Sequence, residues 1–112
     1  MKLPNGNRAD LGLKLEEYVL NSQHRDGRHK ARVFGSALGI TLADPSPLRQ
    51  AVLAAAATSD EVEARGNNGY GNVYVLRFPL RTAKGSAIIL AAWIIRHGED
   101  VPRLTTCYIV ST

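Results

Sequence analysis

The chain has 112 residues, which fits a single domain large enough to form one hydrophobic core. Hydrophobic residues make up 45% of the sequence but aromatic residues only 6%, so Ala, Leu, Val and Ile must build most of that core. The net charge of +4 by itself favours an acidic partner only weakly, because many small domains carry such a charge.

The cysteine content and the apolar runs bear on the cellular compartment. The single cysteine, Cys107, excludes an intrachain disulfide and suits a reducing compartment. The N-terminal residues lack the apolar stretch of a secretory signal, and the longest apolar run, residues 87–95, is too short to span a membrane. We therefore expect a cytoplasmic protein, or a piece of a larger one delivered elsewhere, without a membrane partner.

The chain begins with a turn signal and then shows helical spacing. The turn signal at residues 4–7 predicts a small hairpin or an arm. Asp10 is the predicted N-cap of a first helix, which ends at Asn21. The apolar residues of this helix recur at helical spacing and are Leu11, Leu15, Tyr18 and Val19.

Two further helices are predicted. The second covers residues 28–38 and ends at Gly39, with Ile40 as the apolar contact that follows. The third begins with Ser46 as its cap and Pro47 in its first turn. The predicted buried residues are Val33, Phe34, Ala37 and Leu38 in the second helix, and Leu48, Ala51, Val52 and Ala55 in the third.

From residue 60 onward the pattern is typical of strands joined by short turns. We expect strands over residues 61–65, 72–80, 86–96 and 104–110. Short connections favour an antiparallel meander of three to four strands. The predicted fold class is α+β, with two or three N-terminal helices packed on this C-terminal meander. We expect one domain over residues 1–112, helical in about residues 10–58 and a sheet in about residues 60–112.

The most informative segment is a basic loop that leads into the second predicted helix. Residues 24–32 contain four Lys or Arg, two His and one Asp. A basic loop with imidazole groups before a helix N-terminus can hold a phosphate and move a proton beside it. Helical phase places Lys30 at the edge of the buried face, three and four residues before Val33 and Phe34.

Each polar residue of this segment has a functional and a structural interpretation. Lys30 and Arg28, with the free N–H groups of the helix start, can bind a phosphate, whereas Lys30 can instead pair with a carboxylate. His24 is a candidate general acid or base, whereas a lone loop histidine is more often solvated or caps a helix. His29 is a weaker candidate, because its place in the first turn can face solvent.

A second candidate set lies on the last two predicted strands. Alternation places Thr106 and Tyr108 on one face of the last strand, and Arg96 on one face of the strand before it. These three residues converge on one patch if the register allows, and such a patch suits phosphate positioning. The alternative interpretation is a polar outer face of the sheet.

Several other chemistries lack support in the sequence. No glycine motif for phosphates or dinucleotides is present, and one Cys with three His at unhelpful spacings argues against a metal site. Paired carboxylates for two-metal catalysis are not apparent. A mid-strand Cys107 is typical of a core residue and not of a nucleophile. We therefore expect neither a metal nor a cofactor.

A spaced motif runs through the basic segment and consists of Asn21, His24, Gly27, Lys30, Ala31 and Phe34. It resembles a motif of a family of small uncharacterised bacterial domains. Residues 2–6 and 93–108 also look like that family, so the resemblance covers nearly the whole chain. More loosely, the loop motif is similar to toxin modules of bacterial polymorphic toxins. The order of helices and sheet resembles the fold of barnase, EndoU, colicin-type ribonucleases and RelE.

The looser resemblance implies metal-independent RNA cleavage of toxin type, in which the ribose 2′-OH attacks the adjacent phosphorus. His24 would then act as base or acid, while Lys30 and Arg28 would stabilise the phosphate charge. The chain lacks the Glu–His pair of barnase and the two-His pattern of EndoU, which leaves the individual roles open. The predicted catalytic residues are His24, Lys30, Thr106 and Tyr108, and the predicted phosphate ligands are Arg28, His29 and Arg96.

Two other hypotheses stay open. One is a non-catalytic module that binds nucleic acid or an acidic protein through residues 24–32, with the salt sensitivity of charge pairing. The other is a structural domain whose loop only caps the second helix. The expected partners are RNA and a small co-encoded acidic antitoxin or immunity protein that covers the basic patch.

Overall fold

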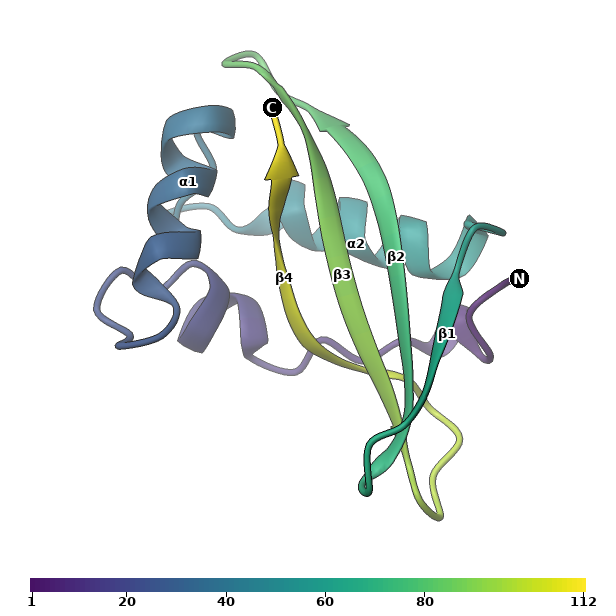
Figure 1. Ribbon diagram of the computed structural model, residues 1–112. Coiled ribbons are helices and arrows are strands. Elements are labelled where there is room, and N and C mark those ends of the chain that lie inside the picture. Colours follow the sequence, from purple (N-terminus) through teal and green to yellow (C-terminus); the bar gives the residue numbers. More distant parts are fainter.

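The sheet in the second half of the chain determines the shape of the molecule. The computed structural model describes residues 1–112. Its strands pair in chain order and are β1 (Glu63–Asn67), β2 (Gly71–Arg81), β3 (Ser86–Arg96) and β4 (Arg103–Ser111). Every pairing is antiparallel, so the sheet is a meander with β1 and β4 at its edges (Figure 1). The predicted α+β class is confirmed.

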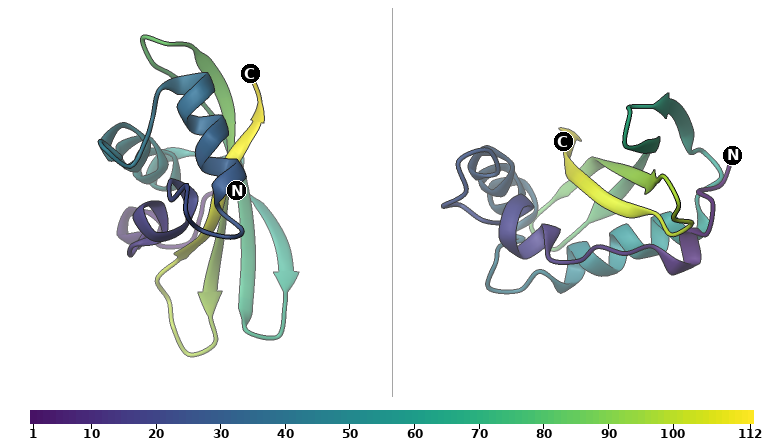
Figure 2. Two further views of the ribbon diagram at one scale, coloured as in Figure 1. Left: turned by 90° about the vertical axis from the view of Figure 1, so that its left-hand side faces the viewer. Right: turned by 90° about the horizontal axis from the view of Figure 1, so that it is seen from below.

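All helical segments lie on one side of this sheet. They are α1 (Arg28–Leu38), α2 (Ser46–Thr58) and two short turns, η1 (Gly6–Arg8) and η2 (Leu15–Val19). α1 stands beside the β4 edge, and α2 crosses behind the sheet (Figure 1). The edge-on view shows that the helices cover one face and leave the other open (Figure 2). None of the helices has both the length and the apolar character needed to cross a membrane.

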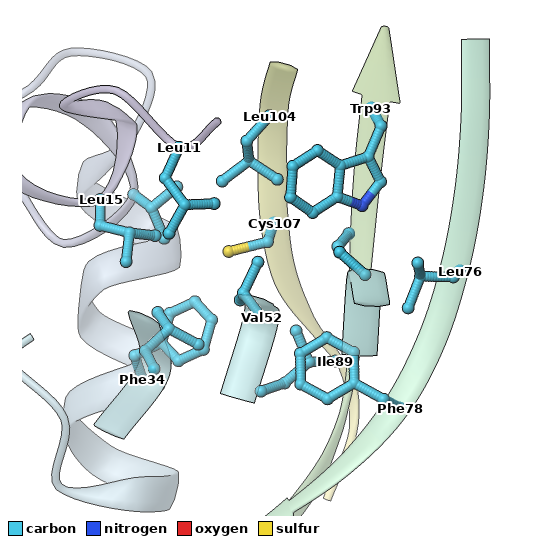
Figure 3. Close-up of a cluster of buried hydrophobic side chains, with 14 of the residues drawn as sticks. Leu11, Leu15, Phe34, Val52, Leu76, Phe78, Ile89, Trp93, Leu104 and Cys107 are labelled. Atoms are coloured by element: carbon cyan, nitrogen blue, oxygen red, sulfur yellow. The ribbon is translucent and has the colours of Figure 1, made fainter. Parts of the chain in front are cut away.

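The covered face of the sheet carries the main hydrophobic core. Trp93, Ile89 and Cys107 are fully buried there and pack against residues from α1, α2 and η2 (Figure 3). Burial raises the pKa of the Cys107 thiol to about 12. The cysteine is therefore a neutral core residue, as its position in a strand predicts.

The open face of the sheet is apolar at its centre. Val75, Leu90 and Ile94 are buried on this face but lie outside the main core cluster. The register places Arg77 of β2 beside Leu90 of β3, and Leu90 beside Tyr108 of β4. These three residues form one row across the sheet, so an exposed arginine lies on the same face as a predicted site residue.

The second predicted helix matches α1 at both ends. Gly39 adopts a φ of 69° and ends the helix. The Ile40 N–H donates to the Phe34 carbonyl at 3.2 Å, which is the bond of a Schellman-type end. Phe34 is buried as predicted, but Val33 is 39% exposed. The prediction for Val33 is wrong because Ala31, about one turn before Phe34, completes the buried stripe instead.

The first predicted helix is wrong in its extent. Only Leu15–Val19 is helical, as a π-helical turn. Gly12 adopts a φ of 52°, a left-handed conformation that interrupts any helix starting at Asp10. Asp10 is therefore not an N-cap. Its side chain accepts a hydrogen bond from the Gly12 N–H at 2.8 Å, and its backbone forms a bridge with Arg103.

Three smaller predictions also differ from the structure. The N-terminal turn signal forms the single turn η1 and not a hairpin or an arm. Ser46 is the first residue of α2 and not its cap, because its hydroxyl donates to Asp44. β1 begins later than predicted and continues into the predicted turn. A bulge between Ala64 and Gly66 lets Gly66 pair with Val73.

Candidate functional site

Three side chains from distant parts of the chain meet at the β4 edge of the sheet. The Lys30 ammonium, near the start of α1, lies 5.1 Å from the ring centre of Tyr18 in η2. It lies 5.8 Å from the ring centre of Tyr108 in β4. Both distances are within the range of a cation–π interaction. Lys30 forms no ion pair, so two aromatic rings hold the ammonium in place of a carboxylate.

The surroundings of the Tyr18 phenol favour its ionised form. Hydrogen bonding from Lys30 is the main cause that lowers the pKa of Tyr18, and the Lys30 charge and the Thr106 hydroxyl add to it. Partial burial and the charge of Asp26 oppose the shift. The Thr106 oxygen is buried and has no hydrogen-bond partner of standard geometry. The Thr106 hydroxyl therefore lies beside the phenol and can form a further hydrogen bond.

His24 is fixed by its own loop. Its Nδ1 accepts hydrogen bonds from the backbone N–H groups of Asp26 at 3.0 Å and Gly27 at 3.1 Å. A ring nitrogen that accepts N–H donors carries no proton, so the neutral ring holds its proton on Nε2. The ring also packs edge-on against Tyr18, with centroids 4.9 Å apart. His24 thus orders the segment that leads into α1 and offers one N–H donor.

Close backbone packing holds η2 against the loop before α1. A Cβ on Gly27 would lie 2.0 Å from the Tyr18 carbonyl oxygen, so only glycine fits there. The φ of Gly27 is −90°, which any residue adopts. Lack of space for a side chain, and not the backbone conformation, is therefore the reason for this glycine. η2 is also tied to α2 by an ion pair between Glu16 and Arg49. These contacts set Tyr18 relative to Lys30.

The basic segment keeps its charges free. The four ion pairs of the molecule all lie outside residues 24–32. Arg25, Arg28 and Arg32 are exposed there, and their one side-chain hydrogen bond runs from Arg32 to Nδ1 of His29. Unpaired cations beside a helix start attract anions.

A cleft of about 760 Å³ opens beside the Tyr18–Lys30 pair. Residues 10–14, η2, the loop before α1 and the paired ends of β3 and β4 form its walls. Tyr18, His24 and Arg96 all line it. The phenol, the imidazole and an unpaired arginine therefore face one shared space.

The structure brings four of the predicted site residues into one region. Thr106 and Tyr108 share the open face of the sheet, as alternation predicts, and pair with successive alternate residues of β3. Lys30 contacts the Tyr108 ring, and His24 reaches the same region through Tyr18. Residues far apart in the sequence thus share one surface.

The three predicted phosphate ligands are more scattered. Arg96 lies on the same face as Thr106, but Thr106 pairs with Ala92, which puts Arg96 about 13 Å farther along β3. Arg96 therefore joins the site only through the cleft. Arg28 and His29 are exposed on the first turn of α1.

Two residues of this region were missed as site residues, Tyr18 and Arg77. The sequence pattern assigns Tyr18 to a buried stripe, whereas the structure leaves it half-buried with its phenol at Lys30. Arg77 lies in an apolar strand. Its alternation with the buried Leu76 and Phe78 is the signal that places it on the open face.

The donor set suits proton transfer and anion binding. It consists of a phenol, an ammonium and an imidazole N–H, with a buried hydroxyl beside the phenol, and such groups act on oxyanions without a metal. No group of three or more His, Cys, Asp or Glu side chains gathers in the arrangement of a metal-ligand set.

Fold and site together define an α+β domain with one open sheet face and a cluster of polar and aromatic side chains at the β4 edge. A family model described as Domain of unknown function (DUF6883) matches residues 2–111. The chain belongs to that family. No curated protein and no solved structure matches the chain. The looser likeness to ribonuclease toxins stays a prediction.

Proposed function

We propose that this domain is a metal-independent ribonuclease that cleaves RNA through attack of the ribose 2′-OH on the adjacent phosphate. The observation that carries the proposal is the Tyr18–Lys30 pair, in which an ammonium lowers the pKa of a half-buried phenol. Perturbed titratable groups in a cleft are typical of proton-transfer sites. The unpaired cations of residues 24–32 supply the attraction for a polyanion.

In this proposal Tyr18 and Lys30 move the protons. The Tyr18 phenolate takes the proton of the 2′-OH while that oxygen bonds to phosphorus and the bond from phosphorus to the 5′ oxygen breaks. The Lys30 ammonium gives a proton to the departing 5′ oxygen. The products are a cyclic phosphate and a 5′-OH. Proton transfer from the Tyr18 phenol to the Lys30 amine then restores both groups.

Neighbouring groups bind the phosphate. The Nε2–H of His24 can donate a hydrogen bond to its oxygens, while the buried Thr106 hydroxyl lies beside the Tyr18 phenol. Arg96 lines the same cleft and suits the next phosphate along the strand. His24 acts here as a donor, because its Nδ1 is already engaged by two backbone N–H groups. Tyr108 is the second ring that contacts the Lys30 ammonium, and it helps to position it.

A second candidate function is binding without turnover. The observation that favours it is the exposure of Arg25, Arg28 and Arg32 without ion pairs. Such a surface suits nucleic acid or an acidic protein, for which a co-encoded antitoxin or immunity protein is the expected example. A binding module of this kind shows strong salt dependence and leaves RNA intact.

Incubation of the purified protein with total RNA in EDTA tests both candidates. We expect the wild type to leave cyclic phosphate ends. Tyr18→Phe and Lys30→Met should each lose about 10²–10⁴-fold in rate, the usual contribution of a proton-transfer group. The matched control is Lys2→Met, which removes one charge near the N-terminus, on the side of the molecule away from α1 (Figure 1). This control should retain wild-type activity.

Intact RNA after incubation with the wild type, or normal cleavage by both site variants, contradicts the ribonuclease proposal. Salt-sensitive binding together with intact RNA supports the second candidate instead. Thermal unfolding of each variant, followed by circular dichroism, separates loss of activity from loss of fold.

A further inference from the structure

A smaller groove lies between α1 and β4, next to Lys30. It has a volume of about 250 Å³. His29, Lys30 and Val33 of α1 form one wall, and Tyr108 and Ile109 of β4 form the other. The lining is mostly apolar, in contrast to the charged surface of residues 24–32 around it.

The groove explains why Val33 is exposed. Val33 is 39% exposed on a helix whose buried stripe is formed by other residues. Its side chain faces Ile109, which is half-buried, and Tyr108, whose ring also contacts the Lys30 ammonium. The groove is thus lined by apolar and aromatic side chains beside a cation without an ion pair.

We propose that this groove holds one nucleobase of an RNA strand whose phosphate lies at Lys30. The inference rests on the proposed function and names its substrate class. A nucleotide is a flat, largely apolar ring joined to an anion, and the groove offers a mostly apolar slot beside an ammonium. Aromatic side chains stack on every base, so Tyr108 supplies a platform that does not select a sequence.

The consequence is that the substrate is single-stranded. Bases in a duplex are paired and stacked on their neighbours, and removing one from the helix costs free energy. Unpaired nucleotides can turn a base outward onto a protein surface. A base can enter a groove between a helix and an edge strand only when it is turned outward from its own strand. Loops and unpaired segments are therefore the preferred substrates.

Fluorescence anisotropy with a labelled single-stranded 2′-O-methyl RNA tests the groove, because this probe lacks the 2′-OH and is not cleaved. We expect Tyr108→Leu to weaken binding by about 5- to 150-fold, the range for loss of a base–aromatic stack. Tyr108→Phe keeps the ring and should keep wild-type affinity. Val33→Gln should also weaken binding. Its matched control is Leu53→Gln, at a similarly exposed apolar residue of α2 outside the groove, which should bind as the wild type does.

The same oligonucleotide annealed to its complement should bind more weakly than the single strand. Equal affinity for both forms, or equal affinity of the Val33→Gln and Leu53→Gln proteins, overturns the inference. Its failure is distinguishable from failure of the proposed function. Groove-dependent binding without cleavage of natural RNA contradicts only the ribonuclease proposal, whereas cleavage of natural RNA that is indifferent to Val33→Gln contradicts only the groove.

Discussion

The Lys30 ammonium is the side chain on which the electrostatics of the candidate site depend. Lys30→Met keeps most of the side-chain length and removes the charge. Because Lys30 is the main cause of the low pKa of Tyr18, we expect that pKa to rise toward 10.0 in the variant. NMR titration of the Tyr18 ring, assigned by comparison with Tyr18→Phe, measures the change. An unchanged Tyr18 pKa in Lys30→Met would contradict the proposed pair.

The same pKa shift predicts how stability depends on pH. The folded-state pKa of Tyr18 lies below its unfolded value, so its contribution is fully present above the unfolded pKa and is lost as the pH falls through the folded pKa. The free energy of unfolding should therefore increase more for the wild type than for Lys30→Met as the pH rises from that lowered pKa to about 10, so that the gap between the two proteins widens. Urea unfolding at a series of pH values measures this gap. Lys2→Met should show no such pH-dependent gap.

His24 is expected to act through its acceptor nitrogen. His24→Ala leaves the N–H groups of Asp26 and Gly27 without an acceptor, and we expect a loss of about 1 kcal/mol, as for a helix cap. His24→Asn should recover most of this, because an Asn side-chain oxygen accepts hydrogen bonds from N–H groups a few residues ahead. Urea denaturation of both variants checks the prediction. Equal losses in the two variants would argue against the capping role.

Some of these residue positions could be predicted from sequence, and others depend on contacts that the sequence pattern does not encode. Lys30 could be placed at the edge of the buried face because helical phase is a local property. The place of Tyr18 depends on a π-helical turn and on the contact between its carbonyl and Gly27. The separation of Arg96 from Thr106 depends on strand register, which alternation alone leaves open.

Among the elements, η2 and α1 are joined by a contact that a single methyl group would break. A Cβ on Gly27 meets the Tyr18 carbonyl, so we expect Gly27→Ala to lower the free energy of unfolding by about 1–3 kcal/mol or more. Gly35→Ala, inside α1, places its Cβ 3.7 Å from the Thr41 methyl, an ordinary contact. That substitution should instead stabilise the helix by about 0.5–1 kcal/mol.

Urea denaturation of the two alanine variants provides the test, because their effects are predicted to have opposite signs. Gly27→Ala should also lose RNA cleavage, since it moves Tyr18 away from Lys30. If both substitutions change stability in the same direction, the close packing of η2 against the loop is wrong.

The elements with strong local signals are those that the sequence predicts best. α1 has an apolar stripe and a glycine stop, and β3 is a continuous apolar run between a turn and a loop. The first predicted helix is wrong in its extent because Gly12 takes a left-handed conformation, although the apolar residues keep their helical spacing. Spacing reports which residues are buried and does not by itself report a continuous helix.

Across the whole molecule, the helices and the core occupy one face of the sheet and leave an exposed arginine on the other. Arg77 lies in one row with Leu90 and Tyr108, with its backbone about 10 Å from that of Tyr108. If single-stranded RNA crosses this face, Arg77→Ala should reduce the slope of log affinity against log salt concentration by about 0.7, the effect of one lost phosphate contact. Anisotropy titrations over a range of salt concentrations measure the slope. The slope for Lys2→Ala should equal that of the wild type, and an unchanged slope for Arg77→Ala would exclude this path.

The order of the site residues along the chain also determines when the candidate site can form during synthesis. Tyr18 and Lys30 precede the sheet, whereas Thr106 and Tyr108 belong to its last strand. A ribosome that adds roughly 5–20 residues per second needs on the order of 4–16 s to proceed from Lys30 to Tyr108. Throughout that interval the nascent chain carries Tyr18 and the basic residues but lacks the strand that completes the candidate site. If the domain is a ribonuclease, as proposed, we expect it to be inactive beside its own messenger until translation of β4 is finished.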